Sequence, residues 1–285
     1  MNVIVASKAG YCFGVKRAVK KAYDALKKNK TVYSPGPLIH NEQAMDDMKK
    51  NGLLEVEKIE DIPDFSVVTV RSHGWGKSVY NLAELKNLSI VDLTCPFVNK
   101  IHNIVRKNYS EGKKIIIIGD KTHPEVKGVN DWADNKSIIG EKTEDFTDLK
   151  DDGNFYTVVT QTTFKYEKYQ EIKKFLQENI KNIFFYDTIC DATRERQEEA
   201  LALSSKVDAI IVLGGKNSSN TKKLYEICKQ NCKKTFFAET LNDIDENEIK
   251  LYDSVGITAG ASTPDFIIES VAVSLGCEKN IKELD

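Results

Sequence analysis

The sequence lacks the features of a membrane-spanning or exported protein. None of its apolar runs approaches the roughly 18 residues that are needed to cross a bilayer. The N-terminal stretch "MNVIVASKAG" has neither a basic beginning nor a long apolar segment, so it does not resemble an export signal. We therefore expect a cytoplasmic protein with no membrane partner.

An excess of charge of one sign is also absent, because 41 Lys and Arg stand against 43 Asp and Glu. The net charge of -2 gives no general attraction to nucleic acid. No P-loop pattern indicates a nucleoside triphosphate. The hydrophobic content of 41% is ordinary for a globular protein, and 285 residues allow two or three compact units.

Cysteine is sparse, and none of the six cysteines belongs to a C-x-x-C pair. They are too few for a disulfide framework, and the expected compartment is reducing, so we expect thiols or metal ligands. A single thiol is most often a small buried side chain. Only a pattern among the cysteines would indicate another role.

Three of the cysteines share such a pattern. Each precedes an amphipathic stretch that is typical of a helix, then a short β-rich run and a glycine-containing loop. A polar residue follows each cysteine at the same offset of 28 positions, which gives the pairs Cys12 and His40, Cys95 and His123, and Cys190 and Ser218. Three equal offsets indicate an internal repeat.

The repeat continues through a second helix and a second strand in each copy. The second strands lie in "SVVTVRSHG", "FYTVVTQTT" and "SVGITAGAS", and further polar residues follow them, namely His73, Thr162 and Ser262. The third copy lacks its last strand. Because "NVIVAS" precedes Cys12 as "SIVD" precedes Cys95, we expect the N-terminal strand to complete the third unit.

Alternating strands and helices predict an α/β fold with mostly parallel sheets. The predicted units are residues 13–95, residues 96–190, and residues 191–285 together with the N-terminal strand in residues 1–12. We expect three similar domains in a pseudo-threefold trefoil, with one cysteine of each near the centre. Sites in such sheets form beyond the carboxyl ends of strands, where these cysteines and polar residues lie.

Three converging thiolates suit a soft metal centre. Structural zinc and an all-cysteine cluster both take four protein ligands, so three ligands leave one position open to a substrate. A [4Fe–4S] cluster with three Cys ligands and one open iron fits this pattern best. Cys228, Cys232 and Cys277 have no counterpart in the other repeats, so we assign them to packing.

The loops at predicted helix starts favour an anion. Helix N-termini attract anions through unsatisfied N–H groups. The candidate capping residues are Ser218, Ser219 or Asn220 in one loop and Ser262 or Thr263 in another. Together with the histidines, they predict a phosphate or diphosphate site. Glu125 is either a proton relay that faces this site or an exposed first-turn residue that favours the helix dipole.

A set of motifs carries a resemblance to a known family. The motifs are "GYCFGVKRA", "LIHN", "RSHGW", "DLTCPFV", "THPEVKG", "TQTT", "DTIC", "KNSSNT" and "GASTPD". Together they resemble the 4-hydroxy-3-methylbut-2-enyl diphosphate reductases, and the resemblance covers nearly the whole chain in the same order. Each motif alone has little specificity, whereas the combination is highly specific.

The resemblance implies a trefoil of three α/β domains around a [4Fe–4S] cluster bound by Cys12, Cys95 and Cys190. It assigns the substrate diphosphate to His40, His73, His123, Ser218, Ser219, Asn220 and Ser262. Its catalytic group comprises Glu125, Thr162 and His123, in which Glu125 supplies protons and Thr162 helps to place the substrate hydroxyl.

The implied reaction is a two-electron reductive dehydroxylation of 4-hydroxy-3-methylbut-2-enyl diphosphate. Its products are isopentenyl and dimethylallyl diphosphate, at the last step of the non-mevalonate isoprenoid pathway. The implied electron donor is ferredoxin, flavodoxin or a similar one-electron carrier. Two rival interpretations are a non-enzymatic iron–sulfur sensor, which would usually carry a basic DNA-binding element, and a structural zinc protein, which would need a fourth ligand in phase with the cysteines.

Overall fold

The computed structural model describes residues 1–39 and 41–277. These residues divide into two compact units. The first unit contains Met1–Lys16, Ile39–Met48 and the chain from Asp191 onward, and the second contains Arg17–Leu38 and Lys49–Cys190. Within the described ranges, no helix is both long enough and apolar enough to span a membrane.

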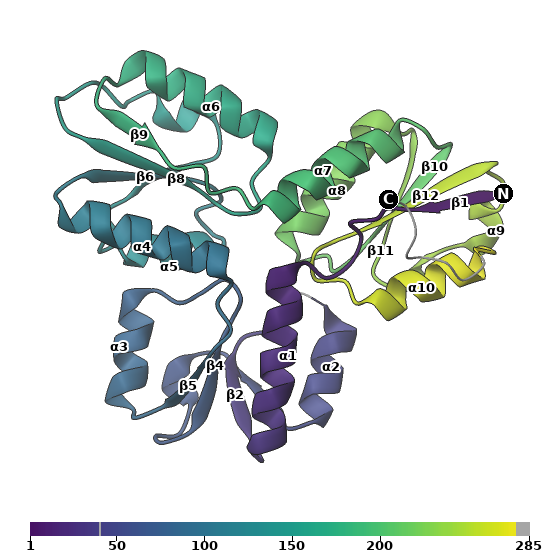
Figure 1. The fold of residues 1–285 in the computed structure, drawn as a ribbon, viewed down its shortest axis with the longest axis horizontal. Coiled ribbons are helices and arrows are strands. Elements are labelled where there is room, and N and C mark those ends of the chain that lie inside the picture. The colour runs from purple at the N-terminus through teal and green to yellow at the C-terminus, as the bar shows by residue number, and fades with distance from the viewer. Residues whose placement is uncertain (40, 278–285) are drawn as a thin grey trace. The chain divides into compact units, whose positions relative to one another are not determined.

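The first unit is built on one parallel sheet with the strand order β1-β12-β10-β11. Its strands are β1 (Asn2–Val5), β10 (Ala209–Leu213), β11 (Lys234–Ala238) and β12 (Ser254–Ala259). Helices α7 (Asp191–Ser204) and α8 (Ser219–Asn231) cover one face and α10 (Asp265–Ser274) covers the other, with the short α9 (Glu246–Ile249) before β12 (Figure 1). β1 pairs with β12, which is the position that the sequence pattern assigns to the N-terminal strand.

The second unit holds two parallel sheets, with the strand orders β3-β2-β4-β5 and β7-β6-β8-β9. The strands are β2 (Val32–Pro35), β3 (Leu53–Val56), β4 (Val67–Val70), β5 (Ser89–Asp92), β6 (Lys114–Ile118), β7 (Ile138–Gly140), β8 (Tyr156–Thr160) and β9 (Ile183–Phe185). The remaining helices of the described chain are α1 (Phe13–Lys28), α2 (Glu42–Lys50), α3 (Lys77–Leu85), α4 (Pro96–Ser110), α5 (Pro124–Asp131) and α6 (Tyr166–Asn179).

The β6 strand shows how alternating side chains build two cores from one run of isoleucines. Ile116 and Ile118 pack toward α6, whereas Ile115 and Ile117 pack toward α4 and α5. Figure 1 shows α6 on one face of this sheet and α4 with α5 on the other. All four isoleucines are at most 2% exposed, and each contributes about 1.5–3 kcal/mol by leaving water. A strand buried on both faces reads as a continuous apolar run, as here.

The three sheets share one strand order when they are aligned on the predicted repeat. The strand before each repeat cysteine is an edge strand, namely β1, β5 or β9, and its neighbour is β12, β4 or β8 in the same sequence of sheets. Parallel sheets with alternating helices confirm the predicted α/β class. The threefold arrangement and the domain boundaries stay predictions.

Candidate active site

The three cysteines of the repeat occupy equivalent places in the fold. Each immediately precedes a helix, and its backbone N–H donates a hydrogen bond to a carbonyl just beyond the neighbouring strand. These bonds run from Cys12 to Ala261 over 3.2 Å, from Cys95 to Ser72 over 3.0 Å, and from Cys190 to Thr162 over 3.0 Å. All three cysteines are partly exposed, unlike the fully buried Cys228 and Cys232.

The position before a helix places sulfur beside backbone N–H groups. The Cys12 sulfur accepts a hydrogen bond from the N–H of Val15, over 3.4 Å, in the first turn of α1. Cys95 is the N-cap of α4, and Pro96 is the first residue of that helix. Since a helix N-terminus carries partial positive charge, both places stabilise an anionic sulfur ligand.

The other cysteines lie in different surroundings. Cys228 and Cys232 are only 0% and 5% exposed, and they pack with Leu203 and Leu224 in the core beneath α7 and α8. Burial raises the pKa of the Cys228 thiol to about 12, so this group stays protonated near neutral pH. Cys277 packs against the core beneath α10. The assignment to packing is confirmed for Cys228 and Cys232, whereas for the partly exposed Cys277 it stays a prediction.

Glu125 is buried, with 1% of its surface exposed, so its interpretation as an exposed first-turn residue is wrong. Both of its carboxylate oxygens accept hydrogen bonds from Thr162. The backbone N–H of Thr162 donates to Oε1 and its hydroxyl donates to Oε2, each over 2.6 Å. This two-point contact fixes the carboxylate in one orientation and places a hydroxyl directly beside it.

Two histidines lie next to this acid in the second unit. His123 is the N-cap of α5, and its Nδ1 accepts a hydrogen bond from the N–H of Glu125 over 3.2 Å. The ring of His73, from the loop after β4, meets the His123 ring edge to face, with the two ring centres 5.3 Å apart. The structure thus brings together His73, His123, Glu125 and Thr162, as a shared site requires.

The first unit holds a polar cluster of its own, at the N-terminus of α8. Ser218 is the N-cap of α8, and its hydroxyl accepts a hydrogen bond from the N–H of Thr221 over 3.3 Å. Asn220 is 4% exposed, yet neither its amide oxygen nor its amide nitrogen has a hydrogen-bond partner among the described residues. Buried amides are nearly always paired, so Asn220 indicates a ligand position.

The loop after β12 lies beside this cluster. The N–H of Gly260 and the hydroxyl of Thr263 both donate to the carbonyl of Leu213, at the end of β10, over 2.8 and 3.1 Å. Ser262 lies between these two donors and is 9% exposed. The carboxyl ends of β10 and β12 therefore bring the Ser218 loop and the Ser262 loop together.

Two predicted residues complete the account of the site. Ser219 is the half-buried first residue of α8. His40 lies outside the residues that the structure describes. Within the described part of the chain, no group of three or more His, Cys, Asp or Glu side chains could hold a metal ion by itself.

Sequence reasoning missed residues that orient the site without belonging to the repeat pattern. The Thr188 hydroxyl donates to the carbonyl of Thr160 and accepts from its N–H, both over 2.7 Å, which ties the segment before Cys190 to the end of β8. Arg196, in α7, is buried and binds three backbone carbonyls. The motif "DTIC" contains Thr188 but gives no sign of this bridging role.

The fold places the three repeat thiols and the loops at helix N-termini at the carboxyl ends of parallel strands, which is where α/β enzymes bind their ligands. Residues 3–276 match the model of the family described as LytB protein. The chain belongs to this family.

Relatives and solved structures agree with this membership. The 4-hydroxy-3-methylbut-2-enyl diphosphate reductase of Clostridioides difficile strain 630 is 46% identical over 277 residues, which cover 96% of this chain and 99% of that protein. The solved E-1-hydroxy-2-methyl-but-2-enyl-4-diphosphate reductase of Plasmodium falciparum has a TM-score of 0.91 at 30% identity, covering 99% of this chain and 89% of that one. A second solved reductase, described as the terminal enzyme of the non-mevalonate pathway, has a TM-score of 0.69 at 37% identity, covering 96% and 98%. The predicted resemblance to these reductases is confirmed.

Proposed function

We propose that this protein reduces 4-hydroxy-3-methylbut-2-enyl diphosphate to isopentenyl diphosphate and dimethylallyl diphosphate. The observation that carries the proposal is the buried Glu125 carboxylate with the Thr162 hydroxyl on it. Loss of a hydroxyl group as water requires a proton donor, and a buried acid beside a hydroxyl can supply one. The names of the relatives from the family support this substrate.

The donor chemistry of the repeat cysteines fits a [4Fe–4S] cluster. Cys12 belongs to the first unit, whereas Cys95 and Cys190 belong to the second. Their sulfurs are soft ligands, are partly exposed, and stand at helix starts with hydrogen-bonded backbones. These three residues would hold the cluster and leave one iron without a thiolate. When bound, the cluster supplies a redox centre and a Lewis acid.

The polar groups of both units suit the diphosphate of the substrate. In the second unit, His73 and His123 can donate hydrogen bonds to phosphate oxygens. In the first, the α8 N-terminus offers Ser218, Ser219 and the buried amide of Asn220, and Ser262 follows from the next loop. We also assign His40 to this group on its place in the repeat. Binding of the diphosphate would leave the other end of the substrate for reduction.

Glu125 and Thr162 would form the proton path. The reaction consumes two electrons and two protons: the bond between carbon and the hydroxyl oxygen breaks, the oxygen leaves as water, and a carbon of the allyl group gains a proton. A threonine hydroxyl can donate and accept at once. When Glu125 is protonated, it can donate to the Thr162 Oγ1, whose own hydrogen then turns toward the substrate oxygen. His123, which accepts the N–H of Glu125, orients this acid at the start of α5. A one-electron carrier such as ferredoxin or flavodoxin would supply the electrons.

The Glu125→Gln variant tests this function. Glutamine keeps the shape of the acid and can still accept the Thr162 N–H, but it has no acidic proton. We expect turnover with reduced viologen under anaerobic conditions to fall by about 10²- to 10⁴-fold, while substrate affinity changes little. Product formation is measured by chromatography of the C5 diphosphates, and affinity is measured by titration of the oxidised protein.

A matched control is Glu144→Gln, since Glu144 is an exposed glutamate in the same unit. It should retain wild-type turnover. Wild-type protein that contains iron but forms neither product would contradict the proposed reaction. Near-normal turnover of Glu125→Gln would instead remove Glu125 from the proton path.

A further inference from the structure

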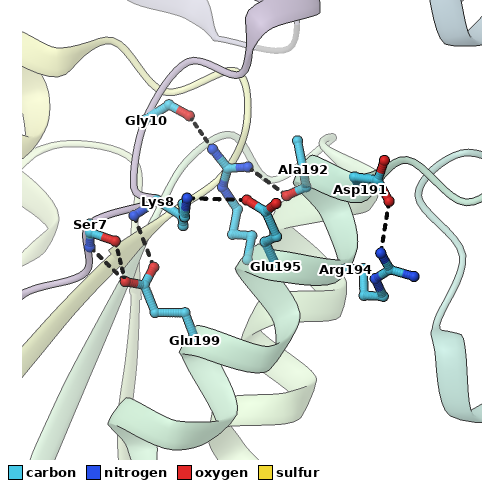
Figure 2. Close-up of polar contacts among 9 residues, drawn as sticks. Ser7, Lys8, Gly10, Asp191, Ala192, Arg194, Glu195 and Glu199 are labelled. Atoms are coloured by element: carbon cyan, nitrogen blue, oxygen red, sulfur yellow. Dashed lines mark hydrogen bonds and ion pairs between the residues drawn. The ribbon is translucent and has the colours of Figure 1, made fainter. Parts of the chain in front are cut away.

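A buried arginine in α7 binds the backbone around Cys12. Arg196 is 3% exposed, and its guanidinium donates to three carbonyls from three segments of the first unit. The acceptors are Gly10 over 2.7 Å, Ala259 over 3.2 Å and Ala192 over 3.0 Å. Figure 2 shows the bonds to Gly10 and Ala192 and labels both residues. One side chain thus joins the loop before Cys12, the end of β12 and the start of α7.

The next turn of α7 binds the backbone N–H groups of the same loop through Glu199. One oxygen of the Glu199 carboxylate accepts from the N–H and the hydroxyl of Ser7, over 2.7 and 2.8 Å, and the other accepts from the N–H of Lys8 over 2.9 Å. Lys8 also forms an ion pair with Glu195 over 3.2 Å. Figure 2 shows Ser7 and Lys8 beside Glu199 at this helix face. The loop from β1 to Cys12 is therefore fixed at two places by one helix.

The carbonyls that Arg196 binds lie close in sequence to two predicted site residues. Gly10 is two residues before Cys12, and Ala259 is two residues before Ala261, whose carbonyl accepts the N–H of Cys12. Ser262 follows directly. Arg196 therefore binds both segments that form this contact. One is the loop before Cys12, and the other is the end of β12 before the Ser262 loop.

No other residue fits the position of Gly10 without a shift of the loop. Its φ of +94° lies in the left-handed region, and a side-chain carbon there would meet Asp265 Oδ1 at 2.8 Å. The loop turns at this glycine, and its carbonyl is the one that accepts from Arg196. Lysine, with one compact ammonium group, cannot match the planar fork of donors that reaches all three carbonyls.

Stability alone is a weak reason for this arginine. Burying a charged group costs several kcal/mol before its hydrogen bonds compensate, and apolar packing is often equal or better for stability. A buried guanidinium instead sets the directions of the carbonyls that it binds.

We propose that Arg196 is a positioning residue, which sets the Cys12 thiol and the Ser262 loop in their binding arrangement. This inference rests on the proposed function insofar as Cys12 is a cluster ligand. Its physical content, the order of the Cys12 loop, is independent of what the thiol binds.

The test compares four variants of the anaerobically purified full chain. Arg196→Gln removes the fork, and Arg196→Lys keeps the charge with fewer donors. Arg194→Gln is the matched control, because Arg194 lies two residues away, is partly exposed and pairs only with Asp191 in the contacts drawn in Figure 2. Leu203→Ala is the stability control, because it leaves a cavity in the core beneath α7.

Three readouts are needed: the melting temperature, the rate of iron loss to a chelator, and the alkylation rate of each cysteine by peptide mass spectrometry. We expect Arg196→Gln to lose iron, and to expose Cys12 to alkylation, at least about tenfold faster, as the loss of one charged hydrogen bond implies. Alkylation of Cys277, in the same unit, should not change. Arg196→Lys should restore part of the protection, and Arg194→Gln should match the wild type.

A purely structural role predicts another result. In that case the rate of Cys12 alkylation would depend only on the loss of melting temperature. Leu203→Ala would then speed Cys12 alkylation as much as Arg196→Gln does for the same loss, and the proposal would be overturned. If the wild type holds no iron, the proposed function fails, but the Cys12 alkylation ratios still decide the role of Arg196. Should Arg196→Gln not fold, Arg196→Lys with unchanged Cys12 alkylation would overturn the proposal.

Discussion

Burial separates Cys228 and Cys232 from the three cysteines of the repeat. Cys228 is fully enclosed by the core beneath α7 and α8, and its high pKa keeps it as an unreactive thiol. Cys12, by contrast, is partly exposed and already accepts an N–H at a helix start. The environment of each sulfur, rather than its residue type, decides which cysteines can bind a metal.

The Cys228→Ser variant tests this division. Serine places a hydroxyl where the sulfur has only a distant acceptor, the carbonyl of Ala200 at 4.0 Å. We expect the free energy of unfolding to fall by about 1–3 kcal/mol, with unchanged iron and sulfide content. Urea unfolding and metal analysis check both outcomes. Loss of iron from a well-folded Cys228→Ser protein would show that the repeat pattern selects the wrong cysteines.

The role of Glu125 could not be predicted from its neighbours in the sequence. Its sequence neighbours allow both a proton relay and an exposed first-turn acid. Its carboxylate oxygens both accept from Thr162, which lies 37 residues away in sequence. A contact of this kind has no local signal, so only the fold could decide between the two interpretations.

Elements were more predictable than the contacts between their side chains. The apolar periodicity after each repeat cysteine predicted α1, α4 and α7, and the β-rich runs predicted β2, β6 and β10. The sequence could not show that Arg196 is buried while Arg194 stays partly exposed. The carbonyls of Gly10 and Ala259, which Arg196 binds, lie 186 and 63 residues away along the chain.

The packing of α4 contains a histidine that should make stability depend on pH. His102 is 5% exposed and lies beside the Trp132 ring, with ring centres 5.8 Å apart. Burial lowers the pKa of His102 from 6.5 to about 4, and the charge of Asp92 opposes this shift only in part. Between these two values the unfolded chain binds a proton that the folded chain excludes. Stability therefore falls as pH drops below about 6.5.

The size of this change in stability follows from the pKa shift of His102. Between pH 7.5 and pH 5.5 we expect the unfolding free energy to fall by about 1 kcal/mol through His102 alone. His102→Gln removes the titration, so its stability should change less over the same interval. Urea unfolding at both pH values measures the difference. Equal pH dependence in the two proteins would show that His102 is not the group responsible.

At the scale of the whole molecule, the internal repeat explains more of the fold than any single motif does. Each of the three sheets has the same strand order. The backbone N–H of each repeat cysteine donates a hydrogen bond to a carbonyl just beyond the neighbouring strand. The sequence predicted this equivalence, because equal spacing and strand periodicity are both visible in one chain. It could not predict the positioning contacts of Thr188 and Arg196, which follow from how loops meet in three dimensions.

The most direct test of the account is metal and sulfide analysis of the anaerobically purified wild type beside Cys12→Ser, Cys95→Ser and Cys190→Ser. If three thiols share one cluster, the wild type contains about four irons and four sulfides per chain, and each single variant loses most of both. A colourless wild type with stoichiometric zinc would contradict the account, as would a full complement of iron in any one of the three variants.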